Sequence, residues 1–267
     1  MRTTISNTLK EVREKAPLVH NITNFVVMNN TANALLAMGA SPVMAHAVEE
    51  VEEMANLAAA VVLNMGTLSP LWVEAMLLAG QKAYQKGTPV VFDPVGVGAT
   101  SYRTKVAAQI IQHCHPTIIR GNASEIMALC DARVKTKGVD STTQSLSAIE
   151  SAKLLAAQTG AVVVVSGETD LIVHQKQLVM LHNDSKLMPS ITGMGCTATA
   201  IIGAMAGVEK DPFKAAVAGM AYLGVAGEIA TERAKGPGSL QMHLLDVLFT
   251  LREEELQKRL KIDEKEM

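Results

Sequence analysis

The sequence predicts one α/β domain with a mostly parallel central sheet and helices on both faces. Helical segments alternate with short strands along the 267 residues, and strands that run parallel in one sheet need such crossovers. The strands are apolar throughout, as in Val162–Val165, which fits burial on both faces. No linker or repeat divides the chain. We therefore expect a single domain over residues 1–267, with about 261–267 as a frayed, charged tail.

The first half of the chain has clear helix punctuation. Gly39 and Gly87 are expected to end helices, and Ser69 followed by Pro70 is expected to begin one. The expected helices are Thr4–Lys15, Asn24–Gly39, Val48–Ala59, Pro70–Gly87 and Ser101–Cys114, and the expected strands are Leu18–Ile22, Pro42–Ala45, Ala60–Leu63 and Pro89–Asp93.

The second half continues the alternation and then becomes helical. Two short alternating segments surround His174-Gln175-Lys176 and predict an antiparallel hairpin at the sheet edge. From Cys196 onward we expect helices separated at Asp211-Pro212 and at Pro237-Gly238-Ser239. The other expected elements are strand Thr117–Arg120, a short helix after Asn122, helix Thr142–Thr159, strand Ala161–Ser166 and the hairpin strands Asp170–Val173 and Gln177–Leu181.

The composition narrows the class of protein. Aromatic residues make up only 3% of the chain, so the core should be layered aliphatic side chains. The net charge is −2 with acids and bases interspersed, which predicts no nucleic-acid surface. Three widely spaced cysteines form no zinc pattern or disulfide framework. The N-terminus does not resemble a secretory signal, and the apolar helices carry charges or are short for a membrane span. We expect a cytoplasmic protein with no membrane partner.

Residues 191–203, ITGMGCTATAIIG, carry the strongest functional signal. Gly193 and Gly195 have no Cβ, so the backbone can turn sharply and direct its N–H groups to one point. The helix that follows leaves its first-turn N–H groups unpaired and directs the positive end of its dipole to the same point. The segment predicts an anion site suited to a phosphoryl group. Cys196 would lie beside it, as a thiol whose thiolate the dipole favours.

Three other segments end in polar side chains. Asp93 ends a buried strand before a glycine-rich loop, although it could simply start the following turn. Arg120 ends the next strand, and Asn122 then caps a helix with Glu125 at its third position. Ser166 ends a further strand. Because the carboxyl ends of parallel strands share one edge, these side chains should line one crevice with the anion turn.

This set of segments, in this order, resembles the ribokinase-like kinases and, more closely, the hydroxyethylthiazole kinases of thiamine salvage. The resemblance extends over nearly the whole chain and includes residues 18–24 (LVHNITN), 39–44 (GASPVM) and 235–239 (KGPGS). Ribokinase-like enzymes in general carry an aspartate where this chain has Cys196, although cysteine is familiar in the thiazole kinase branch. Phe25 stands where that branch more often has a polar residue, so the pocket wall there should differ.

The resemblance implies an activity and a role for each site residue. It implies ATP-dependent phosphorylation of the hydroxyl of 4-methyl-5-(2-hydroxyethyl)thiazole, with Mg²⁺ required, by a homotrimer whose substrate pockets lie between subunits. The implied roles are catalysis for Cys196 and Gly195, thiazole binding for Met44, Gly193 and Asn24, ATP binding for Arg120 and Ser166, and magnesium binding, in part through water, for Asp93 and Glu125.

Structural alternatives to these roles stay open. Cys196 could be a small packed residue at a helix start. Glu125 could be only a capping-box partner, and Arg120 could form a salt bridge to Glu125 or Glu168. Ser166 could cap the following turn.

Alternatives for the whole protein also stay open. A kinase of hydroxymethylpyrimidine or a sugar, or a lyase that acts on hydrated nicotinamide cofactors, would use the same fold, but each should carry aspartate at position 196. A non-catalytic oligomeric relative is a third class, although decay would not be expected to keep every candidate polar residue.

Overall fold

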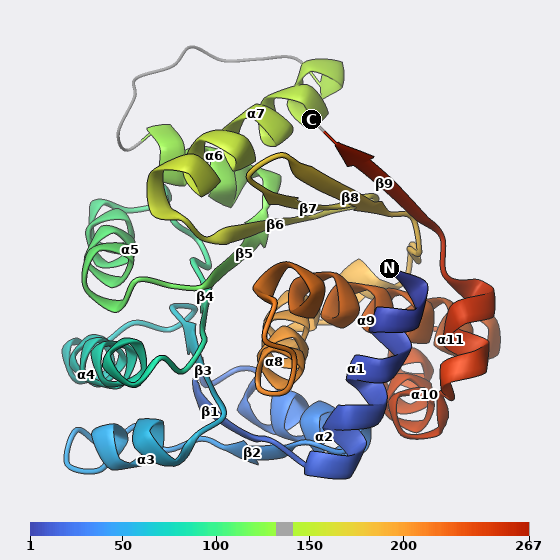
Figure 1. The fold of residues 1–267 in the computed structure, drawn as a ribbon, viewed down its shortest axis with the longest axis horizontal. Helices are drawn as coiled ribbons and strands as arrows, with labels where there is room; N and C mark the ends of the chain where they lie inside the picture. The colour runs from blue at the N-terminus through green and yellow to red at the C-terminus, as the bar shows by residue number, and fades with distance from the viewer. Residues whose placement is uncertain (132–140, 267) are drawn as a thin grey trace.

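The computed structural model describes residues 1–131 and 141–266. Its centre is a nine-stranded sheet in the order β2-β1-β3-β4-β5-β6-β7-β8-β9, with helices on both faces (Figure 1). The strands are β1 (Leu18–Ile22), β2 (Ser41–Val43), β3 (Ala60–Asn64), β4 (Val90–Asp93), β5 (Ile118–Asn122), β6 (Val162–Ser166), β7 (Asp170–His174), β8 (Gln177–Leu181) and β9 (Ile262–Glu266). This architecture confirms the predicted fold class.

The helices follow the predicted alternation closely. They are α1 (Arg2–Lys15), α2 (Met28–Met38), α3 (Val51–Leu57), α4 (Pro70–Lys86), α5 (Ser101–Cys114), α6 (Ala123–Asp131), α7 (Ser141–Thr159), α8 (Met194–Ala206), α9 (Pro212–Arg233), α10 (Pro237–Thr250) and α11 (Glu253–Arg259), with a 3₁₀ turn at Met188–Ser190. Two starts were predicted too early: α2 begins at Met28 rather than Asn24, and α3 begins at Val51 rather than Val48. The Asn24 carboxamide oxygen accepts the N–H of Val26 (3.1 Å), which holds residues 24–27 as a turn before the helix.

The sheet is parallel from β2 through β6 and antiparallel from β6 to β9. The antiparallel hairpin of β7 and β8 was predicted and is confirmed, but its predicted place at the sheet edge is wrong, because β9 lies beyond β8. The expectation of a frayed tail over 261–267 is wrong, because residues 262–266 form β9, paired with β8 from Gln177 to Leu181. A strand at the edge of a sheet need not be buried on both faces and can carry exposed charged residues. Its composition is then the same as that of a charged tail.

Two apolar cores lie on opposite faces of the sheet. Along β6, Val162 and Val164 belong to the core beneath α1, α2 and α8–α11, whereas Val163 and Val165 belong to the core beneath α3–α7 (Figure 1). The alternation follows from the two-residue period of a strand and confirms burial on both faces.

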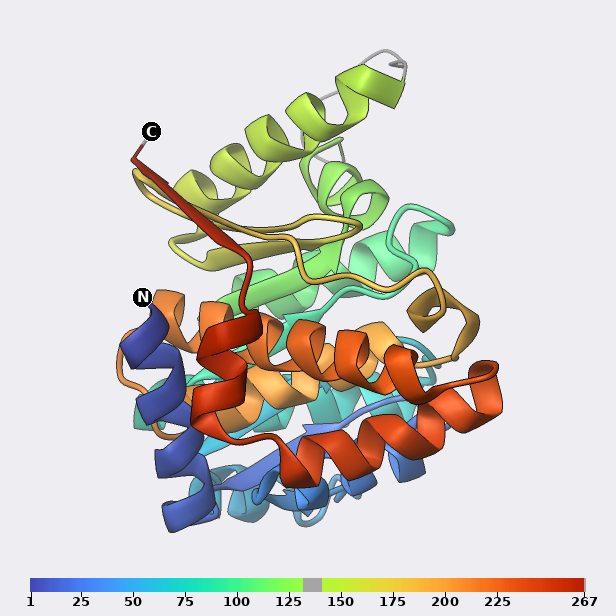
Figure 2. The ribbon, with the colours of Figure 1, turned by 90° about the vertical axis from the view of Figure 1, so that its right-hand side faces the viewer.

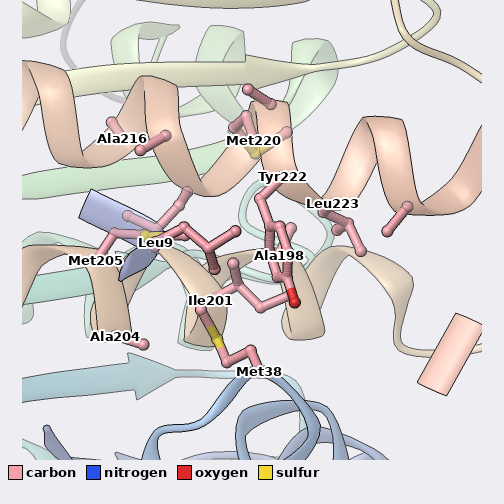
Figure 3. Close-up of a cluster of buried hydrophobic side chains, with 14 of the residues drawn as sticks. Leu9, Met38, Ala198, Ile201, Ala204, Met205, Ala216, Met220, Tyr222 and Leu223 are labelled. Carbon is pink, nitrogen blue, oxygen red and sulfur yellow. The ribbon is translucent and has the colours of Figure 1, made fainter. Parts of the chain in front are cut away.

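Helix α9 forms the centre of the first core. It packs against α8, and α10 doubles back along it (Figure 2). Tyr222 extends from α9 toward Ile201 of α8 and Met38 of α2 (Figure 3), and its hydroxyl donates to the backbone oxygen of Leu248. By length and hydropathy α9 could span a membrane, but 89% of its most apolar window is buried inside the fold. Its composition is therefore accounted for by its position in the core.

Candidate active site

The predicted anion turn lies at the first turn of α8. Gly193 is the N-cap, with φ of 82°, and a Cβ there would come within 2.4 Å of Val27. The first backbone donor bonded within the helix is Thr197, which donates to Gly193 O (2.8 Å). The N–H groups of Met194, Gly195 and Cys196 therefore have no partner within α8 and point out of its N-terminus. This arrangement can bind an anion.

Arg120 lies directly against this turn. A Cβ on Gly195 would lie 2.4 Å from Arg120 Nη1 and 2.8 Å from Nη2, so only glycine leaves room for the guanidinium. Nη2 donates to Ser166 Oγ, and Nη1 lies 3.8 Å from Asp93 Oδ2. The nearest carboxylate is thus Asp93, rather than Glu125 or Glu168. Arg120 is 8% exposed and its Nε has no hydrogen-bond partner among the described residues. A cation with free donors is thereby added to the helix N-terminus.

Asp93 lies completely buried at the end of β4. Its Oδ2 accepts hydrogen bonds from Asn64 Nδ2 (2.9 Å) and Thr199 Oγ1 (2.8 Å). Its Oδ1 has no partner among the residues that the structure describes. Burial raises the pKa of the carboxyl to about 6, although the nearby Arg120 guanidinium and the two hydrogen bonds oppose this rise.

Cys196 is half-buried in the first turn of α8, where Asn24 Nδ2 donates to its sulfur (3.4 Å). The predicted thiolate is disfavoured by the surroundings of the sulfur. Burial, together with the charge of Asp93, raises the pKa of Cys196 to about 11, despite hydrogen bonds from Asn64 and Asn24. The group beside the anion turn is therefore a neutral thiol at physiological pH.

Glu125 and Ser166 also shape the site through hydrogen bonds. Glu125 Oε2 accepts the N–H of Asn122 (2.8 Å), while Asn122 Oδ1 accepts the N–H of Glu125 (2.9 Å), which completes the capping box. Glu125 Oε1 accepts the N–H of Gly96 (2.9 Å) and so binds the glycine-rich loop after β4. Ser166 Oγ accepts from Arg120 and lies 3.4 Å from Gly121 O, to which it donates.

Met44 is the one predicted site residue without a described contact to this group. It follows β2, which pairs with β1 at the end of the sheet, and its side chain is half-buried. The segment is held in place by His20, whose Nε2 lies 2.8 Å from Ala45 O. The order β2-β1-β3-β4 puts Met44 on the same side of the site as Asn24 rather than on the side of Arg120.

A cavity of about 790 Å³ opens on the Arg120 side of the anion turn. Its lining includes Arg120, Ser166 and Gly195, and Met220 and Leu223 of α9 provide apolar wall. The volume lies in the usual range for a small-molecule or nucleotide pocket. Among the described residues, no group of three or more histidine, cysteine or carboxylate side chains forms a metal site.

Two residues of the network were missed from the sequence. Asn64 ends β3 directly opposite Asp93, and Thr199 lies one turn beyond Gly195 in α8. The end of a strand was a usable signal for Asn64, since it is the criterion that identified Asp93. Thr199 gives no such signal within a run of small residues.

Comparison with known proteins places this geometry in a family. A sequence model of the hydroxyethylthiazole kinase family matches residues 9–254. Hydroxyethylthiazole kinase of Syntrophus aciditrophicus (strain SB) is 52% identical over 266 residues, covering 98% of each chain. The same kinase of Nitratidesulfovibrio vulgaris (strain DSM 19637 / Miyazaki F) is 51% identical over 251 residues, covering 94% of each.

Solved structures agree with this assignment. The hydroxyethylthiazole kinase protein from Pyrococcus horikoshii OT3 superposes with a TM-score of 0.92 at 41% identity, over 99% of this chain and 100% of that one. Pyridoxal kinase from Staphylococcus aureus, in complex with AMP-PCP and pyridoxal, has a TM-score of 0.64 at 13% identity and shares the fold alone. The family match over most of the sequence, with relatives about half identical, shows that this chain belongs to the hydroxyethylthiazole kinase family.

Proposed function

We propose that this chain transfers the γ-phosphoryl group of ATP to the hydroxyl of 4-methyl-5-(2-hydroxyethyl)thiazole, as a step of thiamine biosynthesis or salvage. The observation that carries the proposal is the position of the first turn of α8, which has different groups on its two sides. Arg120 and the large cavity lie on one side, whereas Cys196 and Asn24 lie on the other. A donor phosphate and an acceptor alcohol could meet at the N–H groups between them.

Arg120, Gly195 and Ser166 support the ATP role. The guanidinium presents planar donors that suit phosphate oxygens, and Ser166 fixes its orientation. Charge that spreads over the γ-phosphoryl oxygens during transfer would be stabilised by Arg120 and by the N–H groups of the turn. Asn24, Gly193 and Met44 are assigned to the acceptor side, in agreement with the family resemblance.

A neutral thiol at Cys196 favours positioning over proton abstraction. In the loose transition state of phosphoryl transfer the acceptor needs little early deprotonation, so its hydroxyl can keep the proton until the new P–O bond forms. Asn24 holds the sulfur in place, and the sulfur would orient the hydroxyl for in-line attack. Cys196 is thus assigned to aligning the acceptor.

Magnesium fits the residues present. Mg²⁺ keeps several waters and takes one or two carboxylates with phosphate oxygens. Asp93 Oδ1 is buried with no partner among the described residues, and each Glu125 oxygen accepts only one described backbone N–H. These two carboxylates would hold the ion, in part through water. With ATP bound, the ion would neutralise negative charge on the phosphate oxygens.

A homotrimer in the cytoplasm completes the proposal. The family resemblance implies a trimer with the acceptor pocket between subunits. Next to Asn24, the side chains of Phe25 and Val26 are 62% and 61% exposed, and Leu71 is 68% exposed. The rings of Phe25 and His46 both pack at a tilt against Trp72, with ring centroids 4.7 and 4.0 Å away. A second subunit that covers this apolar surface would close the acceptor side from water.

The decisive assay measures ADP release from ATP and Mg²⁺ with three classes of acceptor. We expect the thiazole alcohol to give the highest kcat/KM, well above hydroxymethylpyrimidine and sugars. A preference for the pyrimidine alcohol or a sugar would mean that the proposed acceptor is wrong. If no acceptor raises ADP release above the rate measured without one, the result would support a non-catalytic relative. Identification of the phosphate ester by mass excludes uncoupled hydrolysis of ATP.

A further inference from the structure

Asn64 connects the two sides of the site. Its side chain is 1% exposed and lies at the end of β3 between β1 and β4. Its Oδ1 accepts Asn24 Nδ2 (2.9 Å) and the N–H of Gly66 (3.0 Å), and its Nδ2 donates to Asp93 Oδ2 (2.9 Å). One carboxamide therefore contacts both the residue that holds the thiol and the residue that pairs with the guanidinium.

The orientation of this carboxamide is fixed by its surroundings. The backbone N–H of Gly66 can only donate, so it requires the oxygen of Asn64 on its side. The nitrogen then faces Asp93, where the flipped orientation would set a carbonyl oxygen against a carboxylate oxygen. Aspartate at this position would fit the space but offer no donor to Asp93, and alanine would leave Asn24 and Asp93 without their common partner.

The connection extends to both functional groups. Asn24 Nδ2, the donor to Asn64, also donates to Cys196 Sγ (3.4 Å), and Asn64 itself hydrogen-bonds the thiol. Asp93 Oδ2, the acceptor from Asn64, lies 3.8 Å from Arg120 Nη1. The chain from thiol to guanidinium thus passes through two asparagines and one carboxylate, all nearly inaccessible to solvent. We propose that Asn64 is a positioning residue that fixes the position of Cys196, on the acceptor side, relative to Arg120, on the phosphate side. This inference rests on the proposed function.

Kinetics of Asn64→Ala test the proposal. Misplacement of reacting groups by about 1 Å can cost about 100-fold, so we expect kcat to fall about 100-fold while KM for ATP and for the alcohol stays within about threefold. Asn64→Asp should be no better. The matched control is Asn21→Ala, since Asn21 is a buried asparagine of the neighbouring strand whose described side-chain hydrogen bond goes to Val19 O. A purely structural role would lower the melting temperature and raise both KM values in both variants alike, and this result would overturn the proposal.

A double-mutant cycle with Asn24→Ala tests the route. If Asn64 acts through Asn24, the loss of kcat in the double variant falls well short of the product of the two single losses. Independent, multiplicative losses would contradict the route through Asn24.

Alkylation of Cys196 gives a readout that does not depend on activity. Asn64→Ala should change the alkylation rate of Cys196 by iodoacetamide at least about threefold, because Asn24 loses its anchor, while Asn21→Ala leaves it unchanged. An unchanged rate in Asn64→Ala overturns the proposal. If the parent chain accepts another alcohol, only the acceptor assignment fails, and the kinetics are repeated with that alcohol.

Discussion

Substitution of Gly195 by alanine should separate catalysis from stability. Gly195 lies inside the first turn of α8 and has ordinary helical backbone geometry, so alanine can take its conformation and should even favour the helix by up to about 1 kcal/mol. Its Cβ would lie 2.4 Å from Arg120 Nη1, where ordinary contact begins at 3.4 Å, so the guanidinium must retreat by about 1 Å. A displacement of that size costs about 100-fold in kcat/KM for ATP, or about 2.7 kcal/mol of transition-state stabilisation.

Steady-state kinetics and thermal unfolding measured side by side check this reasoning. We expect a Gly195→Ala protein that melts at the parent temperature or above and uses ATP poorly. Gly238→Ala is the control, because it adds the same methyl group in the first turn of α10, where nothing lies within 4 Å. A kcat/KM for ATP within about threefold of the parent would refute the packing of Arg120 against the turn.

Cys196→Ala should lower kcat about 100-fold with both KM values nearly unchanged, whereas Cys196→Asp should stay active. The thiazole alcohol should protect Cys196 from alkylation. Parent-like turnover of Cys196→Ala, without protection by the alcohol, would argue against a role of Cys196 in transfer. Arg120→Ala should raise KM for ATP in a folded protein, with partial rescue by lysine, and unchanged ATP kinetics would remove Arg120 from the site. The pKa of Asp93 is raised from 3.8 to about 6, so the folded state binds the carboxyl proton more tightly than the unfolded state does. The folded protein therefore loses stability as the pH rises from about 4 to about 6 and this carboxyl ionises. Asp93→Asn should therefore be more stable than the parent by about 1–3 kcal/mol near pH 7.5 and no more stable near pH 4 in denaturant titrations, and an equal difference at both pH values would contradict the raised pKa.

Most of the fold could be predicted because helix ends and buried strands have local signals. Gly39 and Gly87 end their helices with φ of 100° and 76°, and Ser69 caps α4 through Trp72 N, as predicted. The start of α2 was misplaced because the Asn24 side chain accepts the N–H of Val26 and holds residues 24–27 as a turn. A single side-chain contact of this kind leaves no periodic pattern in the sequence. The strand at 262–266 was missed because a charged edge strand depends on its neighbour rather than on its own composition.

The site could be predicted as a set of residues but not as a network. Asp93 and Arg120 end parallel strands, and the carboxyl ends of such strands meet at one edge of the sheet. The Gly-Met-Gly turn brings Cys196 to the same edge, so the three residues could be grouped from the sequence. The ionisation state of Cys196 could not be predicted, because burial raises the pKa of its thiol and burial is a tertiary property. The link through Asn64 likewise depends on the register of β3 with β4.

Helix α9 makes the active site and the core parts of one cooperative unit. Met220 and Leu223 line the large cavity, while Tyr222, between them in sequence, is completely buried in the core. The same turn of helix therefore provides part of the cavity wall and packs against α8. Partial opening of this core would remove the pocket wall at the same moment. Heating should thus abolish nucleotide binding and tertiary structure in a single transition, without a folded intermediate that has lost only its site.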